Sequence, residues 1–93
     1  MNMQTLDALD RSTTLGQARK GFRGRLVCIL PTSGSSRLAP EEMERRLLEM
    51  GFIEGAEVEV LHEGPFGRDP MAVRVGHATV ALRRRDASVL LVE

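Results

Sequence analysis

The stretch LLEMGFIEGAEVEV, residues 47–60, places two glycines four residues apart between a helix-like run and a strand-like run. Gly51 and Gly55 are compatible with a loop that cradles a ligand or with a structural joint. The common phosphate-binding loops place their glycines before a helix, where the positive end of the dipole holds the anion. Here a glycine follows a helix, at the negative end of its dipole. We therefore interpret Gly51 as the left-handed residue that ends the helix and Gly55 as the turn before the next strand.

Residues 39–50 upstream of this joint are predicted to form the one clear helix of the chain. Pro40 suits the first helical position, and acidic residues follow it near the positive end of the helix dipole. One stripe of the helix is apolar, formed by Met43, Leu47 and Met50 with Leu48 beside it. The opposite face offers glutamate–arginine pairs at i,i+4 spacing, Glu41 with Arg45 and Glu42 with Arg46. The helix should therefore cover a core with one side.

Downstream of the joint the apolar period changes to two, which is typical of half-buried strands. The alternation appears in AEVEV, MAVRV and TVALR, and Gly76 with His77 separates the last two of these as a tight hairpin turn. RLVCIL upstream and VLLV at the end read as further strands, the first of them covered on both sides. TTLGQARKG reads as a short helical turn, and RRRDAS as a tight turn. The pattern predicts a mainly β small barrel of about five strands, with the helix inserted after the first.

The composition of the chain favours one small domain in which residues 13–93 fold and residues 1–12 form an extension. Apolar residues make up 42% of 93 residues, and 13 basic residues balance 13 acidic ones. Without a net positive charge, Trp or Tyr, nucleic-acid binding is disfavoured. No apolar run approaches the length of a membrane span, no signal peptide is recognisable, and a cytoplasmic location is expected. The single cysteine, Cys28, excludes an intrachain disulfide and is expected to be a core thiol.

Three segments in order, TLGQARKGFRGRLV, ERRLLEMGFIEGAEVEVL and GPFGRDPMAVRVGHATVALRRRDASVLLV, resemble the FeoA family of small cytosolic components of bacterial ferrous-iron uptake. The most specific parts are RLLEMGFIEG with the strand after it, and ALRRRDA. The resemblance implies an SH3-like barrel with a helix after its first strand. It also implies an accessory factor for a membrane ferrous-iron permease whose cytoplasmic part carries a GTP-binding domain. It brings no catalytic residues and no cofactor, and it leaves homo-oligomerisation open.

Catalytic and metal-binding patterns are weak in this sequence. His62 and His77 are the candidate metal ligands, but neither has a partner at a recognised ligand spacing, and the alternative is that both are exposed polar residues. Ser33, Ser35 and Ser36 lack a neighbouring histidine or a nucleophile-elbow pattern. We therefore expect no enzyme. A metal-sensing regulatory domain that acts with a separate DNA-binding partner is the alternative function, and it predicts metal binding through the histidines.

The leading hypothesis is a non-enzymatic module that contacts its partner through the helix and the flanking turns. The candidate contact residues are Arg45, Arg46, Glu49, Phe52, Phe66, Arg83, Arg84 and Arg85. For Phe52 and Phe66 the alternative is a position in the core, and for the three arginines it is a solvated turn. As structural residues we name Gly51, Gly55 and Gly76, because each is expected at a turn or a helix end.

Overall fold

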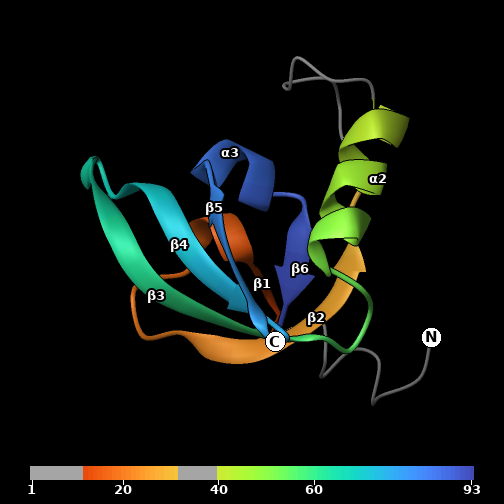
Figure 1. Ribbon diagram of the computed structural model, residues 1–93, viewed down its shortest axis with the longest axis horizontal. Helices are drawn as coiled ribbons and strands as arrows, with labels where there is room; N and C mark the ends of the chain where they lie inside the picture. Colours follow the sequence, from red (N-terminus) through yellow and green to blue (C-terminus); the bar gives the residue numbers. More distant parts are fainter. Residues whose placement is uncertain (1–11, 32–39) are drawn as a thin grey trace.

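The computed structural model describes residues 12–31 and 40–93, which form one antiparallel sheet of six strands in the order β1-β6-β2-β3-β4-β5 (Figure 1). The predictions for residues 1–11 and for Ser33, Ser35 and Ser36 lie outside this part of the chain. The strands are β1 (Thr13–Thr14), β2 (Arg23–Ile29), β3 (Glu57–Phe66), β4 (Asp69–Val75), β5 (Ala78–Leu82) and β6 (Leu90–Val92). Three helical elements accompany them: the 3-10 helix η1 (Leu15–Gln17), α2 (Pro40–Met50) and α3 (Arg84–Ala87).

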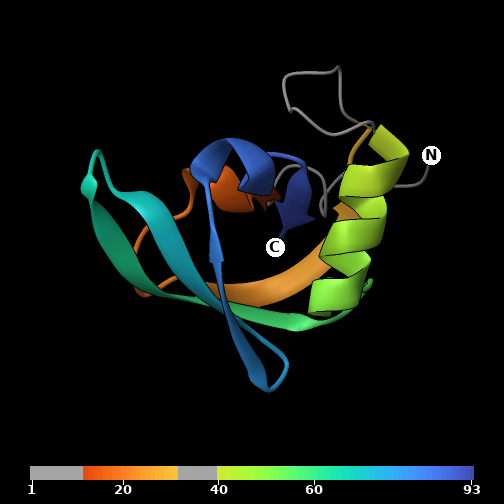
Figure 2. The same ribbon diagram turned by 45° about the horizontal axis from the view of Figure 1, so that its top comes forward.

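The sheet curves around one hydrophobic core, as Figures 1 and 2 show. Its alternating strands turn one side chain in two inward, so that the neighbouring strands β3 and β4 line one side of the core with valines and a methionine. The fully buried side chains come from nearly every element and include Leu15, Leu47, Phe52, Val60, Met71, Val73, Leu90 and Val92. The prediction of a mainly β small barrel with a helix after an early strand is confirmed.

The joint between α2 and β3 has the geometry expected of a glycine-ended helix. Gly51 has a φ of 108°, its N–H donates to the Leu48 carbonyl at 3.0 Å, and the Phe52 N–H donates to the Leu47 carbonyl at 3.0 Å. These two bonds define the Schellman cap. Gly55 follows with a φ of 86°, and the Ala56 N–H bonds to the Ile53 carbonyl at 2.9 Å, which closes a type II turn. Both glycines are structural, as predicted.

The strands after this joint follow the predicted alternation. Val58 and Val60 of β3 are buried while Glu57 is exposed, and β4 buries Val73 and Val75 on either side of the exposed Arg74. Gly76 has a φ of 59° in the two-residue turn between β4 and β5, and Val75 pairs with Ala78 across it. Its positive φ is the reason that glycine suits this position.

The predicted short helical turn is present as η1, and Thr14 stands at its N-terminal end. Residues 13 and 14 additionally pair with β6 as a short strand, which was not predicted. Two other local predictions differ from the structure. RRRDAS contains the short helix α3 rather than a simple turn. In β2, Leu26 alone is buried and Cys28 is half-buried, because this strand has a solvent-facing side instead of cover on both faces.

The ends of the molecule's long axis are occupied by different elements. The β3–β4 hairpin projects at one end and α2 stands at the other, in both views of the ribbon (Figures 1 and 2). α3 lies over the top of the barrel between them in Figure 1. None of the helices in the described part of the chain has the length and hydropathy to cross a bilayer.

Candidate partner-docking surface

The outward face of α2 consists of charged side chains that the fold leaves unpaired. Arg45, Arg46 and Glu49 are exposed, as predicted, and α2 forms no ion pair within the described residues. The predicted i,i+4 pairs of Glu41 and Glu42 with these arginines are therefore wrong. An exposed ion pair gains little Coulomb energy in water, and forming it costs the conformational entropy of two long side chains. These charges are left available to a partner.

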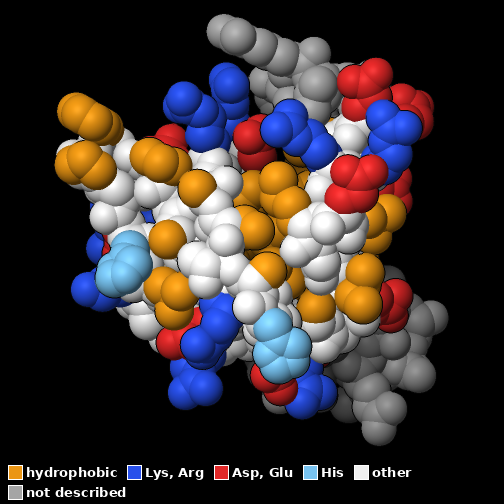
Figure 3. Space-filling view, in the orientation of Figure 1, with side chains coloured by type: hydrophobic (Ala, Val, Ile, Leu, Met, Phe, Trp, Pro, Cys, Tyr) orange, Lys and Arg blue, Asp and Glu red, His pale blue; other side chains and the backbone are white. Residues whose placement is uncertain are grey.

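An apolar groove of about 260 Å³ adjoins the inner side of this helix. Its apolar walls come from the end of β2, from α2 and from the segment before β6, and consist of Ile29, Leu30, Pro31, Met43 and Val89. Two carboxylates of α2, Glu41 and Glu44, also line it. Figure 3 shows hydrophobic side chains gathered in the hollow between β5 and α2, with acidic side chains beside them. Exposed apolar surface that adjoins charged residues is typical of protein contact sites.

The C-terminal end of α2 adds two exposed aliphatic side chains to the same end of the molecule. Leu48 is 43% exposed and Ile53 is 56% exposed, on either side of the Schellman cap. Phe52 lies between them in the sequence but is fully buried in the core. Its prediction as a contact residue is wrong, because the cap folds this ring back under the helix. The sequence did not indicate that Leu48 and Ile53 are exposed, because periodicity alone placed Leu48 beside the buried stripe.

Phe66 is the most exposed large apolar residue that the structure describes, at 82%. It ends β3, at the tip of the hairpin that projects away from α2 (Figure 1). The alternative of a core position for Phe66 is wrong. The structure therefore does not bring together Phe66 and the α2 residues, although they were predicted as parts of one contact surface.

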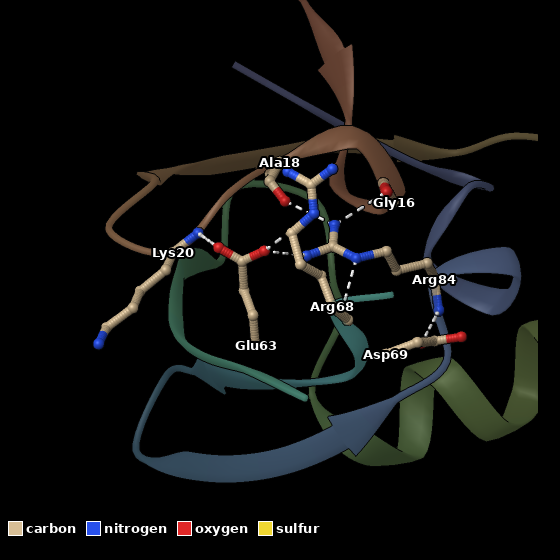
Figure 4. A network of polar contacts seen from close by, with 7 residues as sticks. All are labelled: Gly16, Ala18, Lys20, Glu63, Arg68, Asp69 and Arg84. Carbon is tan, nitrogen blue, oxygen red and sulfur yellow. Dashed lines mark hydrogen bonds and ion pairs between the residues drawn. The ribbon is translucent and has the colours of Figure 1, made fainter. Parts of the chain in front are cut away.

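The three consecutive arginines have different environments. Arg83 and Arg85 are exposed, while Arg84 is half-buried at the start of α3. The Arg84 guanidinium donates hydrogen bonds to four oxygens, as Figure 4 shows: the carbonyls of Arg68 at 2.8 Å, Ala18 at 2.7 Å and Gly16 at 3.1 Å, and Glu63 Oε2 at 3.1 Å. These bonds use four of the five guanidinium N–H donors and leave one Nη2 N–H without an acceptor among the described residues.

Glu63 completes this network, which we call the Arg84 clasp and define as Gly16, Ala18, Lys20, Glu63, Arg68, Asp69 and Arg84 (Figure 4). Glu63 Oε1 accepts the main-chain N–H of Lys20 at 2.8 Å, and Asp69 Oδ1 accepts that of Arg84 at 2.9 Å. The clasp ties η1, the β3–β4 hairpin and α3 into one unit. Arg84 therefore helps to hold the fold together, and its role in partner contact stays a prediction.

A second hollow, of about 290 Å³, lies on the outer face of β2, β3 and β4. It is lined by Arg23, Gly24, Arg25, Glu57, Val58, Glu59, Arg74 and Gly76. Glu59 pairs with Arg23 at 3.9 Å and with Arg74, and Glu57 pairs with Arg25 at 3.8 Å. Because these charges already satisfy one another across the strands, we do not take this hollow as the docking site.

The two candidate metal ligands lie apart on the molecule. His62 is exposed on β3 and His77 is exposed in the β4–β5 turn, and Figure 3 shows the two imidazoles well separated. Across residues 12–31 and 40–93, no three histidine, cysteine, aspartate or glutamate side chains gather as metal ligands. The described residues thus contain no assembled group of metal ligands.

The fold and this surface define a class: a small SH3-like barrel with one inserted helix and an exposed apolar groove beside it. A family model described as the FeoA domain matches residues 13–93, and the chain belongs to this family. The structure is similar to the zinc-bound FeoA of Stenotrophomonas maltophilia, which is described as an SH3 domain protein. The TM-score is 0.70, with 28% identity over 87% of this chain and 89% of that one.

Two further comparisons point to the same family. The FeoA-like protein of Clostridium acetobutylicum has a TM-score of 0.72 and 26% identity, over 88% of this chain and 85% of that one. A curated relative from Porphyromonas gingivalis is a fusion protein of Fe(2+) transport protein A and the Fe(2+) transporter FeoB. It is 43% identical over 49 residues, which are 53% of this chain and 6% of the fusion protein. The match thus covers only a small part of that relative's length.

Proposed function

We propose that this protein is a non-enzymatic accessory factor of ferrous-iron uptake that docks on the cytoplasmic part of a ferrous-iron permease. The observation that carries the proposal is the fusion relative, in which a segment similar to this chain is covalently joined to the transporter FeoB. Fusion of two modules keeps them at a high effective concentration, which is useful when the modules act on each other. The fusion therefore supports the transporter as the partner.

The surface that we assign to this contact is the α2 end of the barrel. It combines exposed apolar side chains, Leu48 and Ile53, with the unpaired charges of Arg45, Arg46 and Glu49. A contact surface of this kind obtains affinity from desolvated apolar side chains and orientation from the surrounding charges. Phe66 and the Arg84 clasp lie outside this surface.

The direct test is a titration of the isotope-labelled full chain with the isolated cytoplasmic GTP-binding domain of the cognate permease, followed by NMR. We expect shift changes at Leu48, Ile53 and the exposed α2 residues, and few at Phe66. Ile53→Asp should weaken binding at least about ten-fold, because it places a charge in a desolvated contact. Phe66→Asp is the matched control, since it introduces the same charge at an exposed apolar site on the hairpin.

Absence of any shift change at high micromolar concentration would remove direct docking to that domain. Changes confined to the hairpin, with Phe66→Asp disrupting binding and Ile53→Asp not, would move the docking surface to the other end. The alternative of a metal-sensing domain stays a prediction that calorimetry with ferrous or manganous ions can check, using variants of His62 and His77.

A further inference from the structure

The strand β5 has one free edge. It is the last strand in the sheet order and pairs only with β4. A free edge presents unpaired backbone groups, and proteins usually protect it with proline, charged side chains or a bulge. β5 reads ATVAL, and its pairing with β4 continues from Val75–Ala78 to Met71–Leu82 without a register shift. None of these protections is present in β5.

The direction of the free backbone groups follows from the pairing. Val75 and Ala78 flank a two-residue turn, so they form a hydrogen-bonded pair, and such pairs alternate along an antiparallel ladder. Thr79 and Ala81 therefore occupy the positions whose N–H and C=O point away from β4. No backbone hydrogen bond in the described part of the chain uses these outward groups. Both residues are exposed and have small side chains, so that another strand can approach closely.

The space beside this edge is bounded on its other side by α2. Figures 1 and 2 show the helix standing across from the upper part of β5, and Figure 3 shows hydrophobic side chains on the floor between them. Val80 of β5 and Met50 of α2 are both partly buried against the core. A second copy of the barrel pairing through this edge would have to place its next strands where α2 stands. A single extended segment requires only the space of one strand.

The charges of the apolar groove, which is lined by α2, the end of β2 and Val89, indicate the chemistry of the segment. Glu41 and Glu44 line the apolar groove between α2 and the end of β2, and neither has an ion-pair partner among the described residues. An incoming chain with apolar side chains at alternate positions and a lysine or arginine beside them would fill the groove and pair with these carboxylates. An acidic segment would be repelled.

We propose that β5 receives an extended apolar and basic segment of the permease's cytoplasmic part as an additional strand, held between β5 and α2. Strand addition obtains affinity from main-chain hydrogen bonds and specificity from alternate side chains in pockets. Here the bonds come from Thr79 and Ala81, and the pocket is the groove beside Met43 and Val89. This inference rests on the proposed function and specifies how the contact is made.

The test uses the full chain and short overlapping peptides that cover the cytoplasmic sequence of the cognate permease. The peptide that binds is then resynthesised with single backbone N-methyl groups, which remove one N–H at a time and leave the protein unchanged. Strand addition predicts a loss of affinity that recurs at every second position, about ten-fold for the central ones. The amides of Thr79 and Ala81 should also become protected from hydrogen exchange.

Two protein variants examine the same edge. Ala81→Pro removes an outward N–H and places a ring in the path of the new strand, while the N–H groups that bond to β4 remain. Ala81→Ser is its matched control and should bind normally. Glu44→Lys should weaken a basic peptide and favour one with the charge reversed.

The outcomes separate this inference from the proposed function. Binding of the whole GTP-binding domain with affinity unchanged by Ala81→Pro would overturn strand addition and leave accessory docking intact. An N-methyl scan without a period of two would overturn it even if the proline variant failed to fold. Failure of the wild-type chain to bind either the domain or any peptide would remove both proposals. Concentration-dependent dimers formed through Thr79 and Ala81 would overturn the inference in another way, because the occupant of the β5 edge would then be a second copy of this chain.

Discussion

At the α3 end of the barrel, the Arg84 guanidinium donates hydrogen bonds to four oxygens, whereas the arginines and glutamates of α2 have no ion-pair partner among the described residues. Both regions are rich in charged residues in the sequence. The difference is whether another element lies close enough to provide a hydrogen-bond acceptor or an opposite charge. We infer that the Arg84 clasp maintains the fold and that the α2 end is left for recognition, and three substitutions test this division.

The largest effect is expected for Arg84→Ala. The change removes the donors to Gly16, Ala18 and Arg68 and leaves Glu63 without its closest guanidinium, which should lower the free energy of unfolding by roughly 2–3 kcal/mol. Denaturant unfolding followed by circular dichroism measures this. Arg85→Ala is the matched control, one residue along the same helix with an exposed side chain, and should cost less than about 0.5 kcal/mol. Equal losses in the two variants would contradict the clasp.

An intermediate effect is expected for Gly51→Ala, because the backbone of the alanine would have to adopt the φ of 108° that Gly51 has. The Cβ would stand 3.8 Å from the Val75 side chain, which is an ordinary contact, so the cost is backbone strain of about 1 kcal/mol. Asparagine tolerates this backbone region better, and Gly51→Asn should lose less stability. Thermal melting of the two variants checks the order. Unchanged stability in the alanine variant would refute the assignment of the cap.

The smallest effect on stability is expected for Phe66→Ala. A ring that is 82% exposed buries little surface, so the free energy of unfolding should change by less than about 0.5 kcal/mol. Affinity for the GTP-binding domain should also remain within about two-fold of wild type, because the hairpin lies away from α2. Calorimetric titration provides the measurement. A loss of binding without a loss of stability would show that recognition extends to both ends of the barrel.

Local signals in the sequence predicted the elements whose geometry is set by neighbouring residues. The helix end at Gly51, the turn at Gly55 and the two-residue hairpin at Gly76 all depend on backbone angles within a few residues. The alternation of Val58 and Val60 fixed which side of β3 faces the core. These features made the mainly β barrel predictable before any contact between distant residues was known.

Contacts between distant residues account for the features that the sequence did not predict. Arg84 bonds to Gly16 and Ala18, which lie 68 and 66 positions away, and no spacing rule connects them. The two aromatic candidates, for which the sequence allowed the same two interpretations, occupy different environments for a similar reason. Phe52 is drawn into the core by the helix cap, while Phe66 lies at a hairpin tip that extends beyond the core. Local pattern cannot distinguish these two environments.

The pairing of the earliest and latest described segments has a consequence for how the chain folds. Thr13 pairs with Val92, and the main chains of Arg25 and Glu93 exchange hydrogen bonds of 2.9 and 3.0 Å. Such contacts join residues that are synthesised far apart in time. The pairing of β1 and β2 with β6, which closes the barrel, can therefore form only after β6 has been synthesised. Pairings of this kind slow folding, because the entropy of a long loop is lost before the contact forms. We therefore expect the β3–β5 meander to form first during translation and the barrel to close last.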